Sequence, residues 1–312
     1  MPTVVLVGTF RTSLVAFLVA CVAVVLSGCG GSGNAGEDIL FVGTRDGDYA
    51  LFGMNRDGGN QGRISDEQGD PSSPQGLRFQ VEPAWSPDGQ QIAFASSREG
   101  SLDVFVMDAD GSNTLRLTST KDNDGHPTWS PDGKRIAFHR SDGHLYVMQA
   151  DGSAARRVTT TLAPEAEPAW SPDGRWLAYQ QRTPGTSIRE IWLVSPEGGE
   201  ARQLTKLDAQ SYTPAWAPDG RTIAFSSNDK GSRYGIFAIG VDGTGLRQVT
   251  PAASTDAFEP SWSPDGNLIA FSRDGSIVTI DPQGAETVLT EAENNDSSPA
   301  WRPAGATDQE GS

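Results

Sequence analysis

Apolar and polar residues alternate along many short segments of the chain, and turns that contain glycine and proline separate these segments. Clear examples are the stretches Ile92–Phe94, Ile136–Phe138, Ile223–Phe225 and Ile269–Phe271, which all read Ile-Ala-Phe. A period of two is typical of β-strands, whereas an amphipathic helix repeats every 3.6 residues. The sequence therefore predicts an all-β protein.

One motif, Pro-x-Trp-Ser-Pro-Asp-Gly with small variations, occurs six times. Ser-Pro-Asp-Gly favours a tight turn, because proline fixes φ at one corner and glycine accepts the positive φ required at another. The tryptophans are Trp85, Trp129, Trp170, Trp216, Trp262 and Trp301, at spacings of 44, 41, 46, 46 and 39 residues. Their recurrence at one strand position predicts that they pack between repeats.

Each repeat has room for four strands. A second hairpin follows the first, with turns such as Asp110-Gly111 and Asp151-Gly152. A short fourth strand ends at a threonine, namely Thr118, Thr159, Thr205, Thr250 or Thr290. Four antiparallel strands in about 40 residues are typical of a propeller blade.

The two ends of the repeat region complement each other. The region opens with the second, third and fourth strands of a blade, Ile39 to Ser65, and closes with a lone first strand, Pro299 to Pro303. Pairing these ends leaves no free sheet edge. The sequence therefore predicts a six-bladed β-propeller of four-stranded antiparallel blades, closed by N- and C-terminal strands that share one blade.

The segment before the repeats predicts export. Residues 1–28 contain no acid and one base, Arg11, followed by an apolar run from Leu14 to Leu26. That run is short for a membrane span and fits the core of a signal peptide. We expect residues 1–28 to be a signal peptide, 29–37 a flexible tether, 38–303 the propeller and 304–312 a disordered tail.

The segment Leu26-Ser27-Gly28-Cys29 resembles the bacterial lipobox. The resemblance implies that Cys29 is acylated, becomes the new N-terminus and anchors the protein to a lipid membrane. Gly30, in place of an aspartate, implies export to the outer membrane, facing the periplasm, in a Gram-negative organism. The alternative is an uncleaved anchor in which Cys29 has no role.

Charge limits the partners that can be expected, and cysteine content limits the disulfides. The chain has 24 basic and 40 acidic residues, a formal net charge of −16. A surface with this charge repels phosphate backbones, so nucleic acid is not expected as a partner. Removal of the leader would leave Cys29 as the sole cysteine, which predicts a domain without disulfides. We expect a monomer.

The Pro-x-Trp-Ser-Pro-Asp-Gly-x-x-Ile-Ala-Phe units, over residues 38–303, resemble TolB-like β-propellers and the propellers of prolyl oligopeptidases and tricorn-type proteases. The resemblance implies a non-enzymatic scaffold in the cell envelope that binds a protein or peptide partner, with a relation to the Tol-Pal system. TolB-like proteins carry an additional N-terminal domain, where this chain has a tether. No G-x-S-x-G nucleophile elbow or separate hydrolase domain is present.

In propellers of this family, one face carries the loops that enter each Trp strand. The resemblance implies that residues leading into Pro-x-Trp surround the central opening there, namely Glu82, His126, Glu167, Tyr212, Glu259 and Ser298. Three glutamates on alternate blades would form an acidic mouth for a cation or a basic peptide. Alternatively they form local ion pairs with the arginines after the second strands, Arg45, Arg98, Arg140, Arg182 and Arg273.

One loop on the same face is about twice as long as its equivalents. Residues 66–81 place Leu77 and Phe79 there. Long loops on a rigid scaffold are often functional, so Leu77 and Phe79 are candidates for a binding surface. Tolerance of an insertion is the alternative.

The three histidines, His126, His139 and His144, fall in one repeat. With Asp124 or Asp142 they are candidate ligands for zinc or another divalent cation, although the spacing matches no metal signature. This reading supports an alternative function as a metal-dependent lyase or hydrolase, since related propellers include a histidine-ligated oligogalacturonate lyase. No other cofactor is expected.

Overall fold

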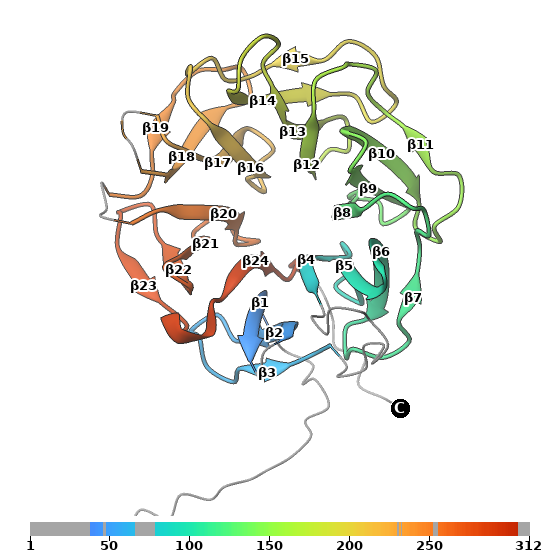
Figure 1. Cartoon of the computed structure of the whole chain (residues 1–312). Coiled ribbons are helices and arrows are strands. Elements are labelled where there is room, and N and C mark those ends of the chain that lie inside the picture. Colours follow the sequence, from blue (N-terminus) through green and yellow to red (C-terminus); the bar gives the residue numbers. More distant parts are fainter. Residues whose placement is uncertain are drawn as a thin grey trace, which may run out of the picture. The chain divides into compact units, whose positions relative to one another are not determined.

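The computed structural model describes residues 38–45, 48–65, 79–229, 231, 233–251 and 255–304, which all belong to the compact unit Gly31–Ser312. These residues form six four-stranded antiparallel sheets arranged as a ring around a central axis (Figure 1). The architecture is a six-bladed β-propeller, which confirms the predicted fold class. Among the described residues, no helix is long and apolar enough to cross a membrane.

Each blade runs from an inner first strand to a short outer fourth strand. Blade 1 contains β24 (Ser297–Trp301), β1 (Ile39–Arg45), β2 (Asp48–Met54) and β3 (Gly62–Arg63); blade 2 contains β4 (Gln80–Trp85), β5 (Gln91–Glu99), β6 (Ser101–Asp108) and β7 (Leu115–Arg116). Blade 3 contains β8 (Asp124–Trp129), β9 (Arg135–Arg140), β10 (His144–Gln149) and β11 (Arg156–Arg157); blade 4 contains β12 (Glu165–Trp170), β13 (Leu177–Arg182), β14 (Arg189–Val194) and β15 (Arg202–Gln203). Blade 5 contains β16 (Ser211–Trp216), β17 (Thr222–Ser227), β18 (Gly235–Gly240) and β19 (Arg247–Gln248). Blade 6 contains β20 (Ala257–Trp262), β21 (Ile269–Arg273), β22 (Ser276–Ile280) and β23 (Glu286–Val288), and the short 3-10 helix η1 (Ala292–Asn294) leads back to blade 1.

The ring closes within blade 1, where the two ends of the described chain meet. Strand β24 pairs with β1 in the register Ile39↔Trp301 and Leu40↔Ala300. Beyond the strands, the Arg302 N–H donates to the Asp38 carbonyl at 2.8 Å. Figure 1 shows the red β24 beside the blue β1. The predicted sharing of one blade by N- and C-terminal strands is confirmed.

The tryptophans pack between blades, as the repeat predicts. Trp170 of blade 4, for example, is 7% exposed and belongs to one apolar cluster with Ala137, Leu145 and Val147 of blade 3. Trp85 of blade 2 has the same relation to blade 1. Each buried indole therefore fixes one blade against the preceding one.

The Ser-Pro-Asp-Gly turns lie at one end of the propeller, here called the turn face; the opposite end is the loop face. In blade 2 the Ser86 hydroxyl donates to Asp88 at 2.6 Å and accepts from the Gln91 N–H at 2.9 Å. Gly174 has φ +71°, and a Cβ there would lie 3.3 Å from Pro131 of the preceding turn. The motif therefore serves turn formation and contact between neighbouring blades.

Candidate binding site in the central channel

The first strand of every blade contains a β-bulge directly before its proline. In blade 2 the pairing of β4 with β5 shifts register between Val81 and Ala84. The residue at the bulge has a left-handed backbone in each blade, with φ between 49° and 59°. We call these six the ring residues: Glu82, His126, Glu167, Thr213, Glu259 and Ser298. A left-handed backbone at a non-glycine residue costs about 1–3 kcal/mol and persists only where surrounding contacts enforce it.

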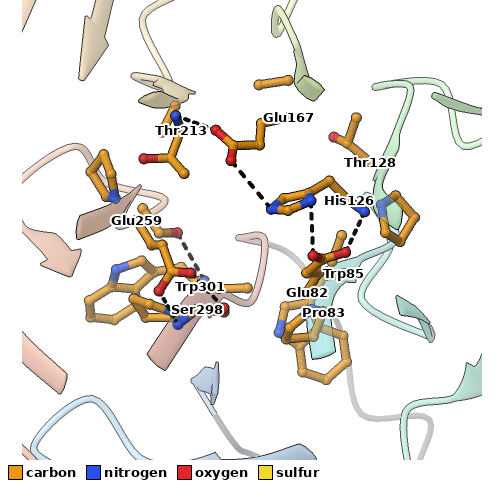
Figure 2. A pocket seen from close by; sticks show the side chains of 18 of the residues that line it. Glu82, Pro83, Trp85, His126, Thr128, Glu167, Thr213, Glu259, Ser298 and Trp301 are labelled. Atoms are coloured by element: carbon orange, nitrogen blue, oxygen red, sulfur yellow. Dashed lines mark hydrogen bonds and ion pairs between the residues drawn. The ribbon is translucent and has the colours of Figure 1, made fainter. Parts of the chain in front are cut away.

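A cavity of about 290 Å³ occupies the channel next to the ring residues. Each first strand lines it with its ring residue, the following proline and the small residue after that, as Glu167, Pro168 and Ala169 do in blade 4 (Figure 2). Trp85, Trp301 and Pro303 line it as well. The cavity therefore extends from the ring residues toward the turn face, whereas the sequence analysis placed the ring residues around an opening on the loop face.

The three ring glutamates bridge neighbouring blades. Each carboxylate accepts a hydrogen bond from the backbone N–H of the next ring residue: Glu82 from His126 at 2.5 Å, Glu167 from Thr213 at 2.7 Å and Glu259 from Ser298 at 2.8 Å. The bridges join blades 2 and 3, 4 and 5, and 6 and 1, so they recur at every second boundary. Hydrogen bonds to ionised acceptors are roughly twice as strong as neutral ones, which gives these carboxylates a structural role.

A second set of polar side chains lies behind the ring residues. The Ser226 hydroxyl accepts from the Glu259 N–H at 3.1 Å and lies 2.9 Å from the Thr213 hydroxyl. The Ser272 hydroxyl donates to the Glu259 carboxylate at 3.0 Å. Ser226 and Ser272 directly follow Ile-Ala-Phe in β17 and β21. The sequence analysis missed both, although their fixed position after that motif was a usable signal.

The His126 side chain faces two other ring residues, Glu82 and Glu167. Its Nδ1 lies 2.9 Å from Glu82 Oε1, and its Nε2 lies 3.9 Å from Glu167 Oε1 (Figure 2). Burial opposes protonation, but the carboxylates of Glu82, Glu167 and Glu259 outweigh it and raise the pKa of His126 to about 9. His126 is therefore an imidazolium at neutral pH.

The two nearest glutamates respond differently to their surroundings. Burial acts to raise the pKa of Glu82, but the charge and hydrogen bonds of His126 outweigh it and lower that pKa to about 2. Burial raises the pKa of Glu167, and His126 offsets this only in part. Glu82 therefore holds the imidazolium closely, and Glu167 interacts with it more weakly.

Tyr212 is not a ring residue, which corrects the sequence analysis. The ring position directly precedes the proline, and in blade 5 that residue is Thr213, next to Pro214. Tyr212 instead lies one residue before the bulge, pairs with Ser226 and does not line the cavity. Its ring packs on Tyr234 at 5.7 Å. The other five predicted residues, Glu82, His126, Glu167, Glu259 and Ser298, do surround the channel.

Three of the five arginines after the second strands pair with carboxylates other than the ring glutamates. Arg45 pairs with Asp296 at 3.0 Å and Arg140 with Asp124 at 2.7 Å. Arg273 pairs with Glu286 at 2.7 Å. Arg98 lies over the Phe105 ring at 5.0 Å, and the Arg182 side chain is exposed. Among the described residues, the ring carboxylates contact backbone N–H groups, His126 and the hydroxyls of Ser272 and Ser298 instead.

The structure brings two of the three histidines together. The rings of His126 and His139 lie 5.1 Å apart, and burial, followed by the charge of His126, lowers the pKa of His139 to about 4. His144 pairs with Arg140, one position from His139, so strand alternation directs it to the opposite side of the sheet. Its Nδ1 lies 3.8 Å from Glu165. In the described residues no three histidine, cysteine or acidic side chains are placed to hold a metal ion.

Phe79 precedes β4 at the loop face, is 37% exposed and stacks on Tyr49 at 5.3 Å. It does not line the central cavity. Leu77, most of the long loop, Cys29 and the segments 1–37 and 305–312 lie outside the described residues. The predictions made for them stay predictions.

Fold and site together define a closed β-propeller whose channel is lined by inward-facing polar residues. The family model described as TolB beta propeller domain matches residues 75–188 and 167–307. The chain therefore belongs to the TolB β-propeller family.

The individual proteins that this chain resembles are similar to it only over a short segment or at low sequence identity. The Tol-Pal system protein TolB of Syntrophus aciditrophicus is 37% identical over 68 residues, which are 22% of this chain and only 13% of that protein. The crystal structure of TolB from Acinetobacter baumannii superposes with a TM-score of 0.72 at 21% identity, over 86% of this chain and 67% of that one. An oligogalacturonate lyase from Vibrio parahaemolyticus gives a TM-score of 0.53 at 16% identity, over 81% of this chain and 74% of that one. At these identities the two structures show the fold alone.

Proposed function

We propose that this protein is a non-enzymatic scaffold of the cell envelope that binds a segment of a protein or peptide partner in its central channel. The observation that carries the proposal is the cavity itself, which all six first strands line with a ring residue, a proline and a small residue. A cavity of about 290 Å³ accepts a few side chains and not a folded domain. An extended peptide segment is the partner that fits such a channel.

The proposed location follows from the leader sequence. Cys29 stands at the acylated position of a lipobox-like segment, and in a Gram-negative organism Gly30 directs such a lipoprotein to the outer membrane, facing the periplasm. Membership of the TolB propeller family supports an envelope location and makes the Tol-Pal system the first place to seek the partner. Accumulation of an unprocessed precursor under globomycin tests the lipid anchor; normal processing would remove it.

The anchor would also orient the cavity. Asp38 lies beside Arg302, one residue past Trp301, so the described chain starts and ends near the turn face. The cavity extends toward the same face. From Cys29 to Asp38 the chain spans at most about 30 Å.

The test of binding is capture of crosslinked partners by the lipidated protein in its own envelope. The variant Glu82→Gln/Glu167→Gln/Glu259→Gln removes the three carboxylate charges while each amide oxygen can still accept the backbone hydrogen bond. We expect the partner to be lost from this variant and retained by the exposed turn-face variant Glu197→Gln. Equal capture by both variants, each shown to be folded at the temperature of the experiment, would reject the channel as the binding site.

A further inference from the structure

Among the described residues that line the central cavity, His126 Nε2 and Glu167 Oε1 face each other without forming a hydrogen bond. Glu167 Oε2 accepts from the Thr213 N–H, but Glu167 Oε1 has no hydrogen bond among the described residues. His126 Nδ1 is directed to Glu82, and His126 Nε2 faces Glu167 Oε1 at 3.9 Å. Figure 2 shows both groups pointing into the channel.

The separation of these two atoms is too long for a direct hydrogen bond. An N–H···O hydrogen bond spans about 2.7–3.2 Å, so at 3.9 Å neither atom satisfies the other. Both side chains are largely enclosed, with exposures of 29% for His126 and 17% for Glu167. A ligand that forms a hydrogen bond with each of these charged groups would gain affinity there, because hydrogen bonds to charged groups are the stronger ones.

In the other two ring glutamates, both carboxylate oxygens already contact neighbouring groups. Both oxygens of Glu82 contact His126, one through the backbone N–H and one through Nδ1. Glu259 Oε2 accepts from the Ser298 N–H and the Ser272 hydroxyl, and its Oε1 accepts from the Ser298 hydroxyl. The pseudo-threefold arrangement is therefore broken at Glu167, and that corner of the channel is the one open to a ligand.

The protonation states of His126 and Glu167 determine which ligand groups this pair can bind. With Nδ1 beside one carboxylate and Nε2 facing another, both ring nitrogens of His126 carry hydrogens, in agreement with its raised pKa. The site then consists of a cationic N–H donor and a carboxylate acceptor a few ångströms apart. A ligand cation in contact with His126 Nε2 would be repelled by the imidazolium, and a ligand carboxylate in contact with Glu167 Oε1 would be repelled by that carboxylate. A neutral group with an adjacent acceptor and donor pairs both.

We propose that this corner binds a primary carboxamide, the side chain of an asparagine or glutamine in a bound peptide. Its carbonyl oxygen accepts from His126 Nε2–H, and its NH₂ group donates to Glu167 Oε1. The proposal rests on the proposed function and names the chemistry recognised at that site. Pro168 and Pro214 beside the pair offer flat apolar surfaces for the rest of an extended peptide.

The probes are four capped tripeptides, N-acetyl-Ala-Xaa-Ala methyl esters with Xaa as Gln, Glu, Lys or Met, together with N-acetylglucosamine. Binding is followed through the His126 ring nitrogens in long-range ¹H–¹⁵N spectra of the full-length protein. We expect the Gln peptide to bind at least about tenfold more tightly than the other probes, because each of them leaves His126 Nε2 or Glu167 Oε1 unpaired or repelled.

The variant Glu167→Gln is the decisive test of whether Glu167 sets the preference for the Gln peptide. Its amide oxygen can accept from the Thr213 N–H, which leaves an NH₂ donor facing the cavity beside the His126 donor. Two donors favour a carboxylate, so the preference should invert toward the Glu peptide. Glu197→Gln, on the turn face, should keep the preference for the Gln peptide, and melting temperatures confirm that both variants are folded.

Several results would overturn the proposal. Equal binding of the Gln and Glu peptides, tightest binding of the Lys peptide or of N-acetylglucosamine, no inversion in folded Glu167→Gln, or no shift of the His126 resonances would each do so. The proposed function fails separately. If the Lys peptide binds most tightly, the channel still binds peptides and only the carboxamide assignment falls. If envelope capture is also insensitive to the channel variants, both fall.

Discussion

His126 and Glu82 form an ion pair across the boundary between blades 2 and 3, with Nδ1 and Oε1 2.9 Å apart. The same carboxylate accepts from the His126 backbone N–H. One glutamate therefore holds both the left-handed backbone and the ring of the next ring residue. This pair explains why His126 is charged and why its Nε2 remains directed into the channel.

The pair predicts how stability depends on pH. The pKa of His126 is raised from 6.5 to about 9, so its stabilising effect is complete below pH 6.5 and is lost between pH 6.5 and 9. The pKa of Glu82 is lowered from 4.5 to about 2, so its effect is complete above pH 4.5 and is lost between pH 4.5 and 2. The contribution of the pair is therefore largest between pH 4.5 and 6.5.

Urea unfolding at pH values between 5 and 9 measures the loss of stability that accompanies deprotonation of His126. We expect the free energy of unfolding to fall by about 1–3 kcal/mol in the native protein, on the scale of 1.4 kcal/mol per pKa unit. His126→Gln should remove most of this alkaline decline while lowering stability at pH 6. An equal decline in the variant would show that other groups titrate there.

Glu259 predicts a stability effect that depends on which atoms are removed. Glu259→Ala deletes the acceptor for both the N–H and the hydroxyl of Ser298, at the boundary where blade 6 meets blade 1. We expect a loss of about 2–3 kcal/mol in the free energy of unfolding, because hydrogen bonds to charged groups contribute about 1.5–3 kcal/mol. Glu259→Gln keeps one oxygen acceptor and should lose less than half as much.

Hydrogen exchange locates the effect of the Glu259→Ala variant. The amide of Ser298 and the β24 amides should lose protection more than those of blade 3, which lies far from the change. A uniform loss over all blades would instead indicate a global effect and contradict the proposed local role.

The repeated motif explains why the fold could be predicted in detail. Trp170 and its equivalents recur at one strand position with a turn directly after, and this pattern alone sets strand count, hairpin position and blade number. The pairing of β24 with β1 followed from counting strands. Packing between blades then needed no further information, because each Trp occupies the same strand position, buried in four blades and partly buried at Trp216 and Trp262.

The site was predicted only in part because the repeat indicates position and not side-chain direction. Tyr212 was predicted in place of Thr213, although Thr213 is the residue directly before Pro214, and a one-residue error in a strand changes the side of the sheet. Likewise His144 and His139 are close in sequence but point to opposite sides. The carboxylate-to-backbone bridges were not predictable, because they depend on the bulge geometry.

Trp170 gives a test of packing between blades. Trp170→Ala leaves a cavity against Leu145 and Val147 of the preceding blade, so we expect a loss of about 3–5 kcal/mol in the free energy of unfolding. Leu162→Ala is the control, since that side chain is 99% exposed and should change stability by less than about 0.5 kcal/mol. Similar losses in both variants would contradict the inter-blade role.

Closure of the ring predicts the consequence of shortening the chain. A variant that ends at Asn295 lacks β24, so β1 loses its partner and Leu40 and Trp85 lose the Ala300 side chain that packs beside them. An exposed edge of this kind pairs with other chains. We expect this variant to aggregate or to elute as oligomers in size-exclusion chromatography, with a melting temperature at least about 10 °C lower.

A variant that ends at Ala304 keeps β24 and should behave as the full chain does. If the variant that ends at Asn295 stays monomeric and equally stable, β24 is not needed to close the propeller.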